Sequence, residues 1–101
     1  MAMIELSVVP LGTATPSISR YVAGALKILQ NEPDIKYELT AMGTIIEGDL
    51  EKLLTLANRM HESAFEAGAV RVGTTIKIDE RRDKPLTISG KLEAVRKKLE
   101  Q

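Results

Sequence analysis

Residues 44–65 read TIIEGDLEKLLTLANRMHESAF and predict a strand, a turn and a long helix in succession. Residues 44–47 are mostly β-branched, which is typical of a strand. Gly48 and Asp49 end that strand, and Asp49 is a residue type that caps helix N-termini, so the helix should begin directly after it. Gly68 is the predicted C-terminal stop. Apolar residues at helical spacing give this helix one buried stripe: Leu50, Leu53, Leu54, Ala57, Met60, Ala64 and Phe65.

The chain before this stretch predicts a strand, a helix and a second strand. Residues 4–9 alternate as a strand does, until Pro10-Leu11-Gly12 interrupts them. Thr15 is expected to cap the following helix, with Pro16 at its first position. Residues 37–42 predict a second strand, which Gly43 bends back onto residues 44–47. The stripe of the first helix consists of Ile18, Val22, Ala25, Leu26 and Leu29.

The chain after this stretch predicts one more strand and one more helix. Residues 70–79 alternate clearly, and Thr74 is the one polar member of an otherwise apolar row. A charged loop covers residues 81–85, and a short last helix follows. The apolar row of the strand is Val70, Val72, Ile76 and Ile78, and the stripe of the helix is Ile88, Leu92, Val95 and Leu99.

The predicted order is β-α-β-β-α-β-α, which fits an α+β fold in a single domain over residues 1–101. Two right-handed βαβ halves placed side by side give a four-stranded antiparallel sheet with both main helices on one face. This is the ferredoxin-like βαββαβ sandwich with an extra C-terminal helix. The helix-covered face should take Ile4, Leu6, Val8, Leu39, Val70, Val72, Ile76 and Ile78. The other face should carry Glu5, Ser7, Val9, Glu38, Thr40, Met42, Arg71, Thr75 and Lys77.

The composition removes many classes of function. Fourteen Lys and Arg balance fourteen Asp and Glu, which argues against a binder of nucleic acid or of an anionic membrane. There is no Cys and a single His, which argues against thiolate chemistry and against His-rich metal sites. No apolar run approaches the roughly 20 residues of a membrane span, and the first ten residues lack a basic leader, so a cytoplasmic protein is expected.

Three features carry possible chemistry, and each has a structural alternative. His61 borders the apolar stripe of its helix and is expected to be half-buried and hydrogen-bonded rather than a ligand contact. Glu38, Glu47, Asp79 and Asp83 lie at strand ends or in the following loop, where they are either surface charges or contacts for a small polar or cationic ligand. Residues 10–13, with Ser17 and Ser19, form either an anion-receptive corner or a plain helix cap.

Catalytic motifs are missing. No Ser/His/Asp arrangement, nucleophile elbow or zinc-protease motif occurs, and the corner at residues 10–13 lacks the spacing of a nucleotide-binding loop. The chain is therefore expected not to be an enzyme and to need no cofactor and no metal. A metal-dependent enzyme is the third hypothesis, after a small-molecule binder and an oligomeric regulatory or protein-interaction module.

An ordered series of short motifs covers nearly the whole chain. They are Val9-Pro10-Leu11-Gly12-Thr13, Ser17-Ile18-Ser19 with Tyr21-Val22, Gly43-Thr44 with Ile46-Glu47-Gly48, His61-Glu62, and Arg71-Val72 with Thr74, Arg81 and Asp83-Lys84. The series resembles that of the thiamine-binding protein family. The resemblance implies a ferredoxin-like fold, dimers that associate into tetramers, and binding of thiamine or its hydroxymethylpyrimidine moiety without catalysis.

The candidate ligand-binding residues follow from the chemistry of such a ligand. An aminopyrimidine offers donor and acceptor nitrogens, and a thiazolium carries a positive charge, so carboxylates and hydroxyls suit both. The candidates are Glu47, Thr44, Glu38, Thr40, Ser7, Thr75 and Arg71. Glu47 either contacts the ligand or bonds the loop at Arg81-Arg82, and Thr44 lies on the opposite face of an ideal strand.

Two further expectations concern ion pairing and assembly. Arg71 is expected to order the site or the sheet by pairing with a neighbour such as Glu5, rather than to catalyse. A homotetramer built as a dimer of dimers is expected, through the sheet edges and the half-apolar second face, which no internal helix covers.

Overall fold

The computed structural model describes residues 1–101, and its elements follow the predicted order. The strands are β1 (Ala2–Pro10), β2 (Lys36–Thr40), β3 (Gly43–Gly48) and β4 (Val72–Glu80). The helices are α1 (Ser19–Leu29), α2 (Leu50–Glu66) and α3 (Ile88–Leu99). None of these helices has the length and apolar character that crossing a bilayer would require.

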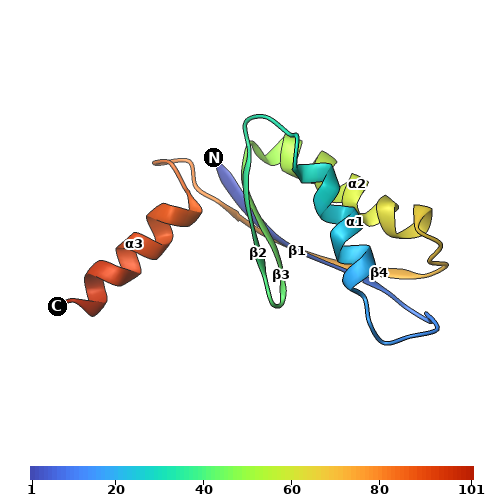
Figure 1. The fold of residues 1–101 in the computed structure, drawn as a ribbon. Coiled ribbons are helices and arrows are strands. Elements are labelled where there is room, and N and C mark those ends of the chain that lie inside the picture. The colour runs from blue at the N-terminus through green and yellow to red at the C-terminus, as the bar shows by residue number, and fades with distance from the viewer.

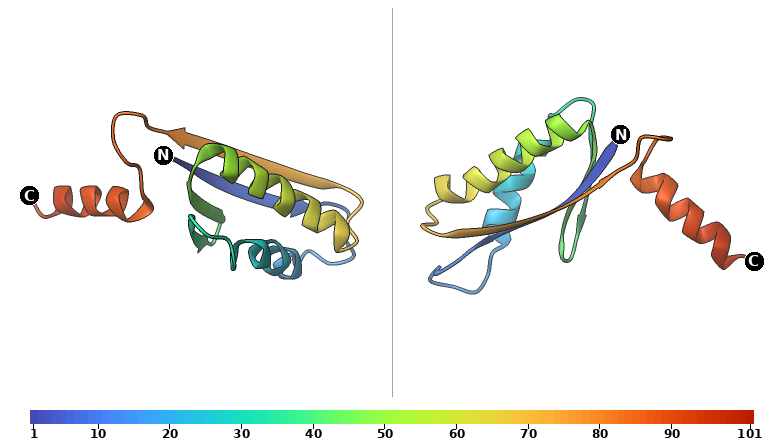
Figure 2. Two further views of the ribbon diagram at one scale, coloured as in Figure 1. Left: turned by 90° about the horizontal axis from the view of Figure 1, so that it is seen from above. Right: turned by 180° about the vertical axis from the view of Figure 1, so that it is seen from behind.

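The four strands form one antiparallel sheet in the order β2-β3-β1-β4. Helices α1 and α2 lie on the same face of this sheet (Figures 1 and 2), so the ferredoxin-like α+β prediction is confirmed. The central strands β1 and β3 carry the core because they are covered most completely. Fully buried side chains on these strands and on both helices include Ile4, Leu6, Leu29, Ile46, Leu53, Leu56 and Met60.

Helix α2 begins and ends as the sequence predicts. The carboxylate of Asp49 accepts a hydrogen bond from the backbone N–H of Lys52, as an N-cap does. At the other end Gly68 adopts a φ of 108°, which a residue with a side chain rarely adopts. The chain therefore leaves the helix where the glycine permits the turn.

The start of α1 differs from the prediction. The helix begins at Ser19 and Ile18 is at the N-cap position without a side-chain cap, so Thr15 is not the cap and Pro16 is not the first helical residue. The Thr15 hydroxyl instead accepts a hydrogen bond from the backbone N–H of Ser17, at 3.3 Å. This local turn uses the Thr15 hydroxyl and the Ser17 N–H that the predicted cap would have used. The helix therefore begins later, at Ser19.

Two strand boundaries also differ. Strand β2 ends at Thr40, the turn consists of Ala41 and Met42, and Gly43 is the first residue of β3 rather than a bend. The Thr40 hydroxyl stabilises this turn, accepting from the N–H of Met42 and donating to the carbonyl of Gly43. Val70 precedes β4 and is 87% exposed, so its predicted place on the helix-covered face is wrong.

The predicted apolar row of β4 is only partly covered. Thr74 faces α2, but Ile76 and Ile78 are 41% and 49% exposed. β4 is an edge strand, so a helix can cover these side chains from one side only. Leu39 on the opposite edge strand, β2, is 53% exposed for the same reason.

The last helix, α3, extends away from the sheet and the other two helices (Figure 2). It is attached near its start, where Leu86 is buried and Lys91 forms a 2.9 Å ion pair with Asp79. Its predicted stripe is present, but no residue of the helix is buried. The exposed fractions reach 54% for Leu92 and 80% for Leu99, so this apolar surface has no partner within the chain.

Candidate functional site

A cavity of about 610 Å³ lies between α1, the second half of β1 and the β2–β3 hairpin. Its walls are mainly apolar, and no charged side chain lines it. Five hydroxyl side chains are the exceptions among the lining residues of α1, of the segment before it and of the hairpin: Ser17, Ser19, Tyr21, Thr40 and Thr44. A concave, mostly apolar space with a few polar groups is the usual form of a small-molecule site.

The cavity exists because the sheet is incomplete at this corner. β1 pairs with β3 only up to Leu6↔Thr44, whereas it pairs with β4 up to Pro10↔Val72. Beyond Thr44 the hairpin closes early, in the turn at Ala41 and Met42. The space beside the end of β1 is therefore bordered by α1 and by the residues just before it.

Three of the candidate residues from the sequence border this cavity: Thr44, Thr40 and Ser7. Thr44 is 5% exposed and lies on the helix-covered face, opposite Leu6 and Leu39 in the register. Its hydroxyl has no protein partner and is available to a ligand. The Thr40 hydroxyl is used in the hairpin turn, and the alternation of β1 directs the Ser7 side chain to the other face.

The other candidates lie outside the cavity. Glu38 and Thr75 are exposed on the open face of the sheet, paired with Ile45 and Ser7. Glu47 shares that face and is 5% exposed, but it is covered by the chain that leads into α3. Its carboxylate accepts a hydrogen bond from the backbone N–H of Ile88, the first residue of α3.

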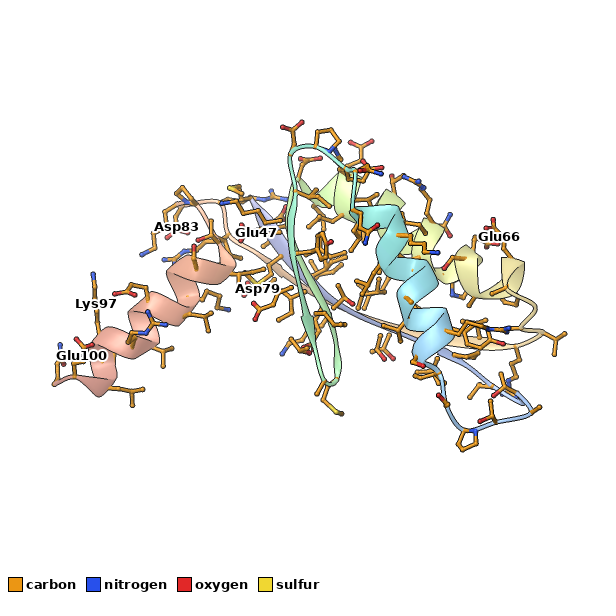
Figure 3. All side chains as sticks on the ribbon, viewed as in Figure 1. Glu47, Glu66, Asp79, Asp83, Lys97 and Glu100 are labelled. Carbon is orange, nitrogen blue, oxygen red and sulfur yellow. The ribbon has the colours of Figure 1, made fainter.

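Figure 3 shows Glu47, Asp79 and Asp83 around the junction between the sheet and α3, away from α1. The loop there carries an ion pair in which Arg81 donates to both carboxylate oxygens of Asp83, at 2.6 and 2.8 Å. This hydrogen bonding lowers the pKa of the Asp83 carboxyl to about 2. The predicted hydrogen bond between Glu47 and the loop at Arg81-Arg82 is therefore wrong, because Glu47 accepts from Ile88, just after that loop.

The expected pairing of Arg71 with Glu5 is wrong. Arg71 precedes β4, where its carbonyl accepts from the N–H of Leu11, while Glu5 lies opposite Lys77. No ion pair in the structure includes Arg71. The error follows from the register, which a single strand's pattern does not specify.

His61 has the structural role expected of it. Its Nδ1 lies 2.6 Å from the Thr74 hydroxyl, and its ring packs edge-on against Phe65 with centroids 5.4 Å apart. These contacts join α2 to β4. No group of three or more His, Cys, Asp or Glu side chains is arranged to hold a metal ion.

The corner at residues 10–13 borders a second, more polar hollow of about 540 Å³. The Arg20 guanidinium lies at this hollow, donates to the carbonyl of Ala67 at 3.2 Å and stacks over the Tyr21 ring. The plain capping interpretation of the corner fails, because α1 has no side-chain cap. The arginine joins the start of α1 to the end of α2.

Sequence reasoning missed the α1 side of the cavity. Val22 and Leu26 were expected in the core, and both are only partly buried because they also line the cavity. Tyr21 lies beside the apolar stripe of α1 and could have indicated a ligand site there. A tyrosine next to such a stripe combines an apolar ring with a polar hydroxyl.

Comparisons with known proteins agree with this fold over nearly the full length. The model of the thiamine-binding protein family matches residues 4–96. The UPF0045 protein YqgV of Bacillus subtilis is 48% identical over 103 residues, covering 99% of each chain. A UPF0045 protein of Methanothermobacter thermautotrophicus is 42% identical over 100 residues, covering 98% of this chain and all of the other.

A solved structure gives the same result. Protein MJ1052 of Methanocaldococcus jannaschii is 39% identical, and its crystal structure superposes with a TM-score of 0.85 over 93% of this chain and 94% of that one. The family model, the sequence identities and the shared fold agree, so this chain belongs to the thiamine-binding protein family.

Proposed function

We propose that this protein binds thiamine or its hydroxymethylpyrimidine moiety without catalysis, in the cavity between α1 and the β2–β3 hairpin. The observation that carries the proposal is the cavity itself, an apolar space of about 610 Å³ in a member of the thiamine-binding family. This volume lies in the range of about 300–1,000 Å³ that small-molecule sites occupy.

The lining favours the pyrimidine end of the ligand. A methylated pyrimidine ring is planar and largely apolar, and the walls from Leu6, Val22 and Leu26 suit it. The Thr44 hydroxyl can donate to a ring nitrogen or accept from the amino group. Because no carboxylate lines the cavity, a thiazolium cation would lie at the mouth, in contact with water, rather than deep inside.

Titration calorimetry with thiamine and with hydroxymethylpyrimidine tests the proposal directly. Leu39→Trp places a large ring at the rim of the cavity, and we expect the affinity to fall by about tenfold or more. Tyr37→Trp is the matched control, because Tyr37 lies two residues earlier on the same face of β2 and outside the cavity. Thr44→Val removes the free hydroxyl and should weaken binding by about two- to tenfold.

Two outcomes would contradict the proposal. The first is the absence of binding of either compound at millimolar concentration by the folded protein. The second is binding that Leu39→Trp and Tyr37→Trp affect equally, which would put the ligand elsewhere.

We also propose that the chain assembles as a homotetramer, a dimer of dimers, with α3 packed on another subunit. Leu92, Val95 and Leu99 are 54%, 58% and 80% exposed on a helix that contacts little of its own chain. The open face of the sheet offers a complementary surface, on which Met3, Val9 and Ile45 are already half-buried. An amphipathic helix without a partner gains stability by covering such a surface.

Light scattering tests the assembly. Leu92→Glu should reduce the mass in solution, whereas Ala94→Glu, which adds the same charge on the opposite side of α3, should not. A wild-type protein that remains monomeric across micromolar concentrations would contradict the proposal. Co-purification of a different protein with that monomer would instead favour an interaction module.

A further inference from the structure

The cavity borders a segment of β1 that is paired on one side only. Pairing with β3 ends at Leu6, and pairing with β4 continues to Pro10. The backbone from residue 7 to residue 10 therefore has an open edge on the cavity side.

The hydrogen-bond pattern identifies the groups on this edge. Leu11 N–H donates to the Arg71 carbonyl at 2.8 Å, which extends the β1–β4 register by one pair. In an antiparallel pair, hydrogen-bonded residues alternate, so the odd-numbered residues of β1 bond to β4 and the even-numbered ones point to the opposite side. Leu6 is the last even-numbered residue with a β3 partner, and Val8 is the next.

Val8 has no partner on that side. Extending the β1–β3 register would place Met42 opposite it, but Met42 belongs to the hairpin turn and its N–H donates to the Thr40 hydroxyl. No turn, loop or side-chain hydrogen bond reaches the Val8 backbone either. Val8 lines the cavity, so its N–H and carbonyl present a donor and an acceptor side by side in a mainly apolar space.

We propose that the N–H and the carbonyl of Val8 recognise the ligand as a donor–acceptor pair. The matching ligand is a heteroaromatic ring in which an acceptor nitrogen lies next to an exocyclic amino group. The inference rests on the proposed function and assigns the subsite for the aminopyrimidine edge. The ring nitrogen accepts from the Val8 N–H, and the amino group donates to the Val8 carbonyl. Hydrogen bonds to an unpaired backbone group gain strength where water is excluded by apolar walls.

A peptide strand fits this edge poorly. Strand addition needs a row of backbone groups, and the next residue on the same edge is Pro10, which has no N–H. The hairpin turn blocks the edge in the other direction. One complete donor–acceptor pair is suited to one small planar molecule.

Amide hydrogen exchange measured by NMR tests the proposal on the unmodified protein. In the free protein, we expect the Val8 amide to exchange faster than those of Leu6 and Val9, which the sheet pairs with β3 and β4. Saturation with hydroxymethylpyrimidine should slow Val8 exchange by about tenfold or more and shift its amide resonance. The Val9 amide serves as the internal control and should change little.

Ligand and protein variants give a second test. The 4-oxo analogue replaces the amino donor by an acceptor and should bind about tenfold more weakly or worse. Val8→Pro removes the N–H and should weaken binding to a similar extent. Circular dichroism checks that this variant folds.

The outcomes separate this inference from the proposed function. Hydroxymethylpyrimidine binding that leaves Val8 exchange unchanged would overturn the backbone subsite alone. A Val8 amide that is already as protected as that of Val9 in the free protein would also overturn it. Absence of any binding would overturn the proposed function, and the subsite with it.

Discussion

Replacing Glu47 by glutamine should loosen α3 without unfolding the core. The carboxylate of Glu47 is 5% exposed and accepts the hydrogen bond of the Ile88 N–H at the start of α3. A hydrogen bond to a charged group contributes about 1.5–3 kcal/mol, and a neutral one about 0.5–1.5 kcal/mol. Glutamine keeps an acceptor oxygen and loses the charge, so the attachment should weaken by about 1–1.5 kcal/mol.

The negative charge also interacts favourably with the helix N-terminus, which adds about 0.3–1 kcal/mol to the loss. A total of about 1.3–2.5 kcal/mol corresponds to a rise of about ten- to seventyfold in the population of detached α3. The strands and the other two helices supply the buried core, so global unfolding should change much less.

Hydrogen exchange of the Ile88 amide and its neighbours in α3 measures this effect. Glu38→Gln is the matched control, because Glu38 also lies on the open face of the sheet but is exposed and makes no hydrogen bond with its side chain. Calorimetry with hydroxymethylpyrimidine should give the same affinity for both variants and the wild type.

Two results would refute this reasoning. If α3 exchange in Glu47→Gln equals that of Glu38→Gln, the Ile88 contact does not hold the helix. If instead ligand affinity falls while α3 exchange stays unchanged, Glu47 contacts the ligand and the site lies near the α3 junction.

Three further perturbations test the fold. Ile46→Ala removes a fully buried side chain of β3 and should lower the free energy of unfolding by about 2–5 kcal/mol, measured by urea titration. Gly43→Ala would bring a Cβ to 2.9 Å from the Leu6 carbonyl oxygen, so β3 must shift from β1 and the melting temperature should fall; an unchanged melting temperature would contradict this close approach. Because the folded-state pKa of Asp83 is lowered to about 2, its ion pair with Arg81 is complete above pH 4 and is lost as the pH falls toward 2. An NMR titration should show this low pKa, and an ordinary value near 4 would contradict the pairing.

Much of the fold could be predicted because its elements differ in period. The long stripe from Leu50 to Phe65 and the alternation at residues 4–9 gave the correct element types, and Asp49 and Gly68 marked the ends of α2. These features depend on local preferences and on burial of one face, which the sequence contains directly. The boundary errors occurred where local alternatives compete, as at Thr15 and at the turn after Thr40.

The candidate site could be predicted only in part. Thr44 was predicted as a ligand contact on the strand face opposite Glu47, and it does line the cavity. Glu47 was identified from the glycines around it, but its hydrogen bond to Ile88 joins residues 41 positions apart in the chain. No local pattern specifies which distant backbone group a carboxylate will meet.

The sequence by itself determined the order of the elements, their periodicity and the face that the central strand β1 buries. Only the tertiary structure decided that β3 stops pairing before β1 ends, that α1 leaves a cavity there, and that Val8 has an open backbone edge. The physical reason is that side-chain patterns report burial, whereas register and helix placement depend on contacts between distant segments. A backbone group left unpaired by that register has no signature in the sequence, because every residue except proline carries the same donor and acceptor.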